Sequence, residues 1–178
     1  MNQELIDRLV KRTANLAIGA SNVRNQGAVG VVSAARKMLR QLDLASYGNN
    51  GVSRFGNLLD RDTERIRRAL PMGARHWGTA RKCVNIFLRD ILYNRFLSDQ
   101  FGFSRFEPLL EVPLDGHVAK GLFEDKGAVQ LPRWRTIKSM TPDLSEEYQS
   151  VAASVAKRKQ TYPVHLDLIY WRATQLKA

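Results

Sequence analysis

The chain has 178 residues, of which 44% are hydrophobic, and its net charge is +11. This length and composition correspond to about one domain with a real core, which excludes wholesale disorder, and no apolar run reaches the roughly 18 residues that a membrane span needs. The excess of lysine and arginine favours a polyanionic partner, because contacts with phosphates release condensed counterions.

Apolar residues recur at three- and four-residue spacing almost everywhere, and alternating strand patterns are scarce, so the sequence predicts an all-α protein. The predicted helices are, in chain order, 5–10, 29–42, 59–70 and 79–97, a short helix after Asp115, one that begins at Thr141-Pro142, and a last one from Pro163. The turn-rich sequence SYGNNG is expected to follow the second helix, and Pro71 to end the third. We expect one compact domain of six to eight helices over residues 1–178.

The two C-terminal helices are predicted from their apolar faces. Tyr148, Val151 and Val155 are expected to point inward from the first of them. Leu168 and Trp171 are expected to do the same in the last one.

The single cysteine, Cys83, excludes an internal disulfide, a four-cysteine zinc site and an iron–sulfur cluster held by one chain. The N-terminal sequence MNQELIDRLVKRT lacks the apolar core of a signal peptide. We therefore expect an intracellular protein, cytoplasmic or associated with the nucleoid, that does not bind membranes.

The segment HWGTARKCVNIFL, residues 76–88, predicts a tight turn followed by a helix that opens with Arg81 and Lys82. Backbone N–H groups at such a helix start favour a phosphate, and Arg75 and Arg81 would add charge there. Trp77 either stacks on DNA or belongs to the core. Taken alone, Lys82 is more simply an exposed helical lysine.

A lone carboxylate stands in LLEVPLDGHVAKGL, residues 109–122. The Val112-Pro113 step predicts a rigid approach, after which Asp115 caps a helix. Taken alone, Asp115 is an ordinary cap. His117 either contacts a phosphate or packs locally.

These two segments together resemble the helix-hairpin-helix DNA glycosylase superfamily, which includes endonuclease III and the oxoguanine glycosylases. GTARKCVNIFL is similar to the hairpin motif, and VPLDGHV to the segment that follows it. The resemblance implies a hairpin over about residues 70–98, Gly78 as its first glycine, Thr79 among the DNA-contacting residues, Lys82 as nucleophile and Asp115 as its assistant. It also implies DNA as partner and leaves room for a monovalent cation at the hairpin, with no iron–sulfur cluster.

The chain departs from the family pattern in two ways. Ala80 replaces the second hairpin glycine, and the stretch between Lys82 and Asp115 is longer than in compact members. The archaeal oxoguanine glycosylases, which also lengthen this stretch, are the nearest analogy.

The chemistry of the two side chains agrees with the resemblance. A lysine amine is a nucleophile only when neutral, a form that burial and neighbouring cations favour. A carboxylate at a helix start can stabilise positive charge developing at C1′ of a sugar. We therefore expect Lys82 to attack C1′ of a flipped nucleotide and form a Schiff base, from which β-elimination would cut the strand. A non-catalytic DNA-binding module and a helical adaptor without a nucleic-acid role are the alternatives.

Two polar segments have competing interpretations. In SNVRNQGAVG, residues 21–30, the side chains of Arg24, Asn25 and Gln26 suit the edge of a flipped base, but we favour a capped turn that ends at Gly27.

In QLPRWRTIKSMTPDL, Arg133, Arg135 and Lys138 suit phosphate contacts around Trp134, but a charged loop with one buried aromatic fits as well. Near the C-terminus, His165 and Asp167 are expected to form a structural pair.

Overall fold

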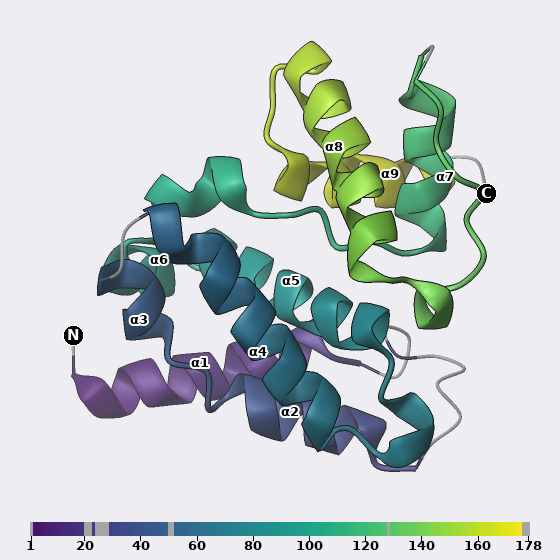
Figure 1. Ribbon diagram of the computed structural model, residues 1–178. Coiled ribbons are helices and arrows are strands. Elements are labelled where there is room, and N and C mark those ends of the chain that lie inside the picture. Colours follow the sequence, from purple (N-terminus) through teal and green to yellow (C-terminus); the bar gives the residue numbers. More distant parts are fainter. Residues whose placement is uncertain (1, 20–22, 24–28, 50–51, 128, 176–178) are drawn as a thin grey trace.

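The protein is described by a computed structural model, which covers residues 2–19, 23, 29–49, 52–127 and 129–175. Within those residues the chain forms helices and no strands, as the apolar spacing predicted (Figure 1). The α-helices are α1 (Gln3–Ala17), α2 (Val31–Leu39), α3 (Leu44–Asn49), α4 (Phe55–Ala69), α5 (Trp77–Tyr93), α6 (Arg95–Phe101), α7 (Gly116–Asp125), α8 (Pro142–Arg158) and α9 (Leu166–Gln175). Short 3₁₀ helices are η1 (Val52–Arg54), η2 (Met72–Ala74), η3 (Phe103–Leu109), η4 (Ile137–Ser139) and η5 (Pro163–His165).

Side-chain caps fix several helix starts. The Asn2 side chain accepts a hydrogen bond from the Glu4 N–H at the start of α1. Thr141 accepts one from the Leu144 N–H, and Pro142 occupies the first turn of α8, as the sequence predicted. These caps place helix boundaries by local chemistry.

Two predicted boundaries were wrong. Part of the SYGNNG sequence forms α3, because the fully buried Tyr47 anchors it in the core by donating a hydrogen bond to Asp62. The helix predicted over residues 79–97 is two helices, because Asn94 leaves the helical conformation at φ −85° and ψ 103°. Its side chain then caps α6 by accepting from the Leu97 N–H.

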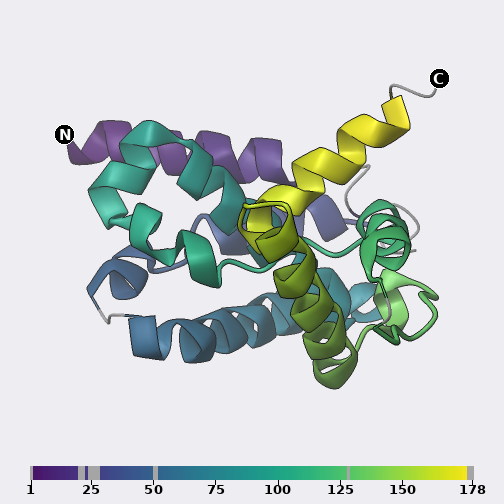
Figure 2. The ribbon, with the colours of Figure 1, turned by 90° about the horizontal axis from the view of Figure 1, so that it is seen from above.

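The buried apolar residues form two clusters. The first is built by α1–α6 and η3 and includes Leu110 and, from η5, Val164. The second is built mainly by α7–α9 and begins at Val112. Figure 1 shows α7–α9 stacked above the earlier helices, and Figure 2 shows α8 and α9 crossing that layer. Residues 110–115, here called the strap, connect the two layers.

Helix α5 is the centre of the arrangement. It packs against α1, α2, α4 and α6 on one side, and against η4 and α8 on the other. Most of its side chains are therefore buried, and those of Cys83, Val84 and Phe87 are almost completely so. In the described part of the chain, no helix is both long enough and apolar enough to span a membrane.

Candidate functional site

Lys82 and Asp115, the two residues predicted to act together, meet in the structure. Lys82 lies in the second turn of α5, and Asp115 is the N-cap of α7. The Asp115 Oδ1 atom accepts hydrogen bonds from the backbone N–H groups of His117 (2.9 Å) and Val118 (3.0 Å). Its Oδ2 atom lies 3.3 Å from Lys82 Nζ, and only 11% of the Lys82 side chain is exposed. One carboxylate thus caps a helix and binds the lysine.

This pair stands on the wall of a cavity of about 530 Å³. That volume lies within the range of about 300–1,000 Å³ that is typical of small-molecule sites. The walls come from the end of α1, the middle of α5, the strap, the start of α7, and α9. The lining residues are Leu16, Ala17, Lys82, Ile86, Arg89, Pro113, Asp115, His117, Asp167, Leu168 and Trp171.

A second charged pair, Arg89 with Asp167, lines the same cavity. The Arg89 guanidinium contacts the Asp167 carboxylate and also donates to Asp90 at 2.8 Å. Burial raises the pKa of Asp167 above the ordinary aspartate value, and Arg89 opposes this only in part. For Arg89, burial lowers the pKa, but Asp90 and Asp167 outweigh it and the pKa is raised. Arg89 therefore stays charged, while Asp167 is shifted towards its neutral form.

Sequence reasoning missed Arg89, Asp167 and Trp171 as parts of this site, although a signal was present. Arg89 follows Lys82 by seven positions, which places both on one face of a helix. Trp171 follows Asp167 by four positions, with the same result. What the spacing could not show is that these two faces look into one cavity.

The predicted pair of His165 and Asp167 was wrong. The His165 ring lies between other partners, with Nδ1 at 2.8 Å from the Tyr93 hydroxyl and Nε2 at 2.7 Å from Glu107. Leu168 and Trp171, which were expected to be buried, are 47% and 56% exposed because α9 turns that face to the cavity and to solvent.

The turn predicted within residues 76–80 was wrong. Helix α5 already begins at Trp77, and the chain reverses over residues 70–76 instead, through η2. Helices α4 and α5 pack against each other on either side of this connection. Gly78 lies inside the first turn of α5, where a Cβ atom would lie 2.5 Å from Cβ of Met140. Close packing by the η4 segment, rather than a turn, requires a glycine there.

Three residues predicted to contact DNA are buried. Gly78 and Thr79 face the protein interior, and Arg81 has a relative exposure of only 9%. The Arg81 guanidinium binds Glu111 and also donates to Asp60 at 2.8 Å. The charge of Arg81 is thus neutralised by two carboxylates of the protein, and the predicted phosphate contact of Arg81 was wrong.

The remaining predicted contacts lie nearer the surface. Arg75 is exposed, and its Nε atom donates to the Leu70 carbonyl at 2.8 Å. Trp77 is half-buried, with the Arg81 guanidinium 5.3 Å from its ring centre. His117 is exposed at the cavity. Arg24, Asn25 and Gln26 lie outside the described residues.

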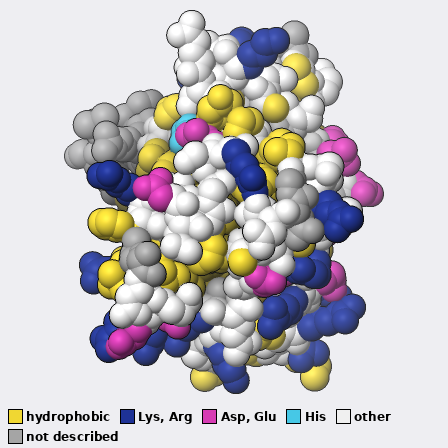
Figure 3. All heavy atoms as spheres, turned by 90° about the vertical axis from the view of Figure 1, so that its left-hand side faces the viewer, with side chains coloured by type: hydrophobic (Ala, Val, Ile, Leu, Met, Phe, Trp, Pro, Cys, Tyr) yellow, Lys and Arg dark blue, Asp and Glu magenta, His cyan; other side chains and the backbone are white. Residues whose placement is uncertain are grey.

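The basic segment of residues 133–138 lies beside the start of α5. Arg133, Arg135 and Lys138 are exposed, whereas Trp134 is half-buried and packs edge-on against Tyr148 with ring centres 5.5 Å apart. The tryptophan therefore packs on the protein, and the cations face solvent, which is compatible with a charged loop as well as with phosphate contacts. The phosphate contacts stay a prediction. On the face in Figure 3, by contrast, basic side chains alternate with acidic and hydrophobic ones and form no continuous basic patch.

The part of the chain that the structure describes contains no group of three or more His, Cys, Asp or Glu side chains placed to hold a metal ion. Comparison with protein-family models, with curated proteins and with solved structures found no match for this chain. The function is therefore inferred from the geometry of the site.

Proposed function

We propose that the protein is a DNA glycosylase in which Lys82 is the nucleophile and Asp115 assists it. The observation that carries the proposal is the distance of 3.3 Å between Lys82 Nζ and Asp115 Oδ2 at the wall of a cavity of about 530 Å³. A nucleophile within reach of a group that can take its proton is the arrangement that covalent catalysis requires.

The proposed reaction begins when the neutral Lys82 amine attacks C1′ of a nucleotide flipped into the cavity. The new N–C1′ bond forms as the glycosidic bond breaks, and the base leaves with the bonding electrons. The Asp115 carboxylate stabilises the positive charge at C1′ and accepts the proton that the amine loses. Ring opening then gives a Schiff base on Lys82, from which β-elimination would cut the strand.

The rest of the cavity suits a nucleobase. The exposed face of Trp171 and the side chain of Leu16 offer apolar surface on which a base can stack. Arg89 and Asp167 add hydrogen-bond donors and an acceptor to the same wall. A pocket with a few polar groups among apolar ones is what selective binding of a small planar ligand needs.

A basic rim near the start of α5 suits the DNA backbone. Arg75 lies in the connection before α5, and Arg133, Arg135 and Lys138 lie on the segment that packs over its first turn. Exposed cations near the start of the helix that carries Lys82 can hold phosphates of the DNA backbone. The net charge of +11 supports the same partner.

Borohydride trapping tests the proposal. The wild-type protein is mixed with a panel of oligonucleotides that each carry one modified or damaged base, with and without borohydride. We expect a covalent protein–DNA adduct with at least one substrate, and we expect Lys82→Gln to abolish it. Lys120→Gln, which removes an exposed lysine of α7, is the matched control and should keep the adduct. Base release that persists without an adduct would mean that Asp115 activates a water molecule instead. If no substrate loses its base, the proposed glycosylase activity is refuted.

One observation favours a non-catalytic DNA-binding module instead. The Asp115 carboxylate is satisfied by two backbone N–H groups and by Lys82, which also suits a purely structural link between α5 and α7. The variants Lys82→Ala and Asp115→Asn separate the two functions. Both should abolish base release with little change in DNA affinity if the protein is an enzyme. A DNA affinity that does not fall with added salt would favour the helical adaptor.

A further inference from the structure

The strap, residues 110–115, carries the chain from the first apolar cluster to the second. Leu110 belongs to the first cluster and Val112 to the second, and both are almost fully buried. Glu111 therefore lies at the boundary between two cores, with 20% of its side chain exposed. A carboxylate at such a place is unfavourable unless the protein supplies it with partners.

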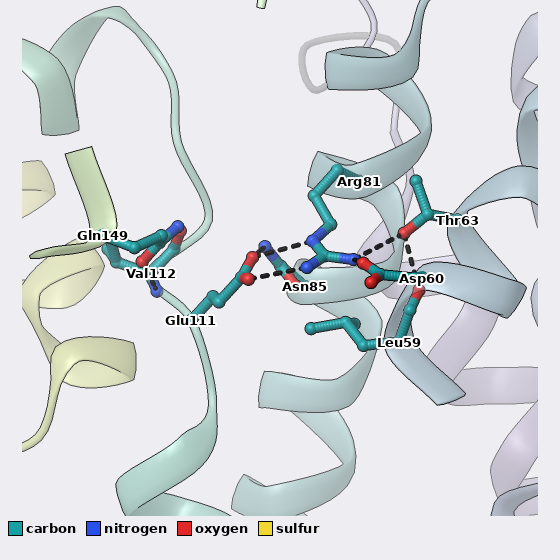
Figure 4. Close-up of polar contacts among 8 residues, drawn as sticks. All are labelled: Leu59, Asp60, Thr63, Arg81, Asn85, Glu111, Val112 and Gln149. Atoms are coloured by element: carbon teal, nitrogen blue, oxygen red, sulfur yellow. Dashed lines mark hydrogen bonds and ion pairs between the residues drawn. The ribbon is translucent and has the colours of Figure 1, made fainter. Parts of the chain in front are cut away.

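Glu111 has three such hydrogen bonds, all from α5. Arg81 donates from Nε at 2.9 Å and from Nη2 at 2.7 Å, and the Asn85 side chain donates at 2.8 Å (Figure 4). The paired bonds of a guanidinium to a carboxylate fix orientation as well as distance. On its far side the same guanidinium donates to Asp60 and Thr63 of α4.

The next residue of the strap is held from the other layer. The Gln149 side chain of α8 accepts a hydrogen bond from the Val112 N–H at 3.1 Å and donates one to the Val112 carbonyl at 2.9 Å. Figure 4 shows Gln149 on one side of the strap, with Arg81 and Asn85 on the other. Neighbouring residues of the strap are thus bound to opposite layers.

Arg81 and Lys82 are consecutive in α5 and bind Glu111 and Asp115, which are four positions apart in the strap. Consecutive side chains of an α-helix point about 100° apart. The strap therefore contacts α5 at two points, through side chains that point in different directions. We propose that Glu111 is a positioning residue that fixes the strap on α5 and so holds Asp115 against Lys82. Its catalytic consequence rests on the proposed function.

Reactivity of the Lys82 amine gives a test that does not depend on catalysis. Reductive methylation with formaldehyde and cyanoborohydride, followed by peptide mass spectrometry, measures how fast Lys82 is modified. Asp115→Asn keeps the helix cap and removes the charge on the carboxylate, so it sets the rate for an unpaired lysine. Glu111→Gln keeps one side-chain oxygen that can accept a hydrogen bond from Arg81. It replaces the other oxygen with an NH2 group, so the paired bonds are lost. We expect this variant to raise the rate of Lys82 methylation to the rate measured in Asp115→Asn.

Asp60→Asn is the matched control, because Asp60 binds the same guanidinium from α4 rather than from the strap. It should leave the Lys82 rate at the wild-type value. A wild-type rate in Glu111→Gln would overturn the inference. Equal increases in the Lys82 methylation rate in Glu111→Gln and Asp60→Asn would also overturn the inference. Arg81 would then act by joining α4 to α5 and not by holding the strap.

Gln149→Leu tests the same inference from the other layer, should Glu111→Gln fail to fold. This variant removes both side-chain bonds to Val112 and should also raise the Lys82 rate, and an unchanged rate would count against a strap held from both sides.

With a substrate in hand, base release in Glu111→Gln should slow by up to about 100-fold at unchanged DNA affinity, which is the order expected when a catalytic group is displaced by about 1 Å. If the wild-type protein releases no base, the proposed function fails, while the labelling rates still decide the role of Glu111.

Discussion

Replacing Gly78 by alanine tests whether the start of α5 is shaped by packing. The added methyl group would lie 2.5 Å from Cβ of Met140 and closer still to the Ile137 carbonyl oxygen, where real Cβ contacts stay above 3.0 Å. Neither atom can rotate away, since one is backbone and the other is fixed to it. The η4 segment would therefore have to move off α5.

Two opposing effects set the size of the change. Alanine is favoured over glycine inside a helix by up to about 1 kcal/mol, and by less in a first turn. Overpacking a well-filled site costs about 1–3 kcal/mol, and a clash with backbone lies at the upper end of that range. We expect Gly78→Ala to lower the free energy of unfolding by about 2 kcal/mol, which corresponds to about 4–8 °C in Tm for a chain of this size.

Thermal unfolding followed by circular dichroism measures this difference. Gly56→Ala is the control, because Gly56 is also in the first turn of a helix and has no neighbour within 4 Å of an added Cβ. Its Tm should be unchanged or slightly raised. If Gly78→Ala unfolds at or above the wild-type temperature, the close approach of η4 to α5 is wrong, and with it the placement of the basic rim.

Three further outcomes are expected. Tyr47→Phe should destabilise the protein by about 1.5–3 kcal/mol in chemical denaturation, because it removes a fully buried hydrogen bond of 2.9 Å to Asp62, and a loss below about 0.5 kcal/mol would contradict the buried bond. Burial raises the pKa of Cys83 to about 12, so iodoacetamide at mild alkaline pH should label this thiol only in the unfolded protein, and rapid labelling of the native chain would mean that α5 opens. Burial also raises the pKa of Asp167 above 3.8, so the folded state binds this proton more tightly than the unfolded state and stability falls as the pH rises from 3.8 through the raised value. Asp167→Asn should flatten that part of the pH profile of unfolding, and an unchanged profile would show that Arg89 keeps the carboxylate ionised.

Much of the local structure could be predicted from the order of the residues. Helical spacing of apolar residues identified the all-α class, and Thr141-Pro142 identified the start of α8, because caps act through bonds to backbone groups only two or three positions away. The same logic made Asp115 a cap, which the structure confirms. The error at residues 76–80 has the opposite origin: Gly78 is needed by a segment some sixty positions later, and nothing in its neighbourhood shows this.

The residues of the candidate site fall into the same two groups, those that local sequence could identify and those that only distant contacts bring together. Lys82 and Asp115 could be singled out from their own segments, and Arg89 could have been found on the same helix face as Lys82. That Asp167 and Trp171 complete the cavity, and that Arg81 turns inward to Glu111 rather than outward, depends on how the second layer rests on the first. Sequence alone determines the all-α class and several helix caps, because these arise from contacts within a few residues. It does not determine α3, which a buried tyrosine anchors in the core. Only the tertiary structure decides which charged side chains face one another, because that depends on the path of the strap between two separately packed cores.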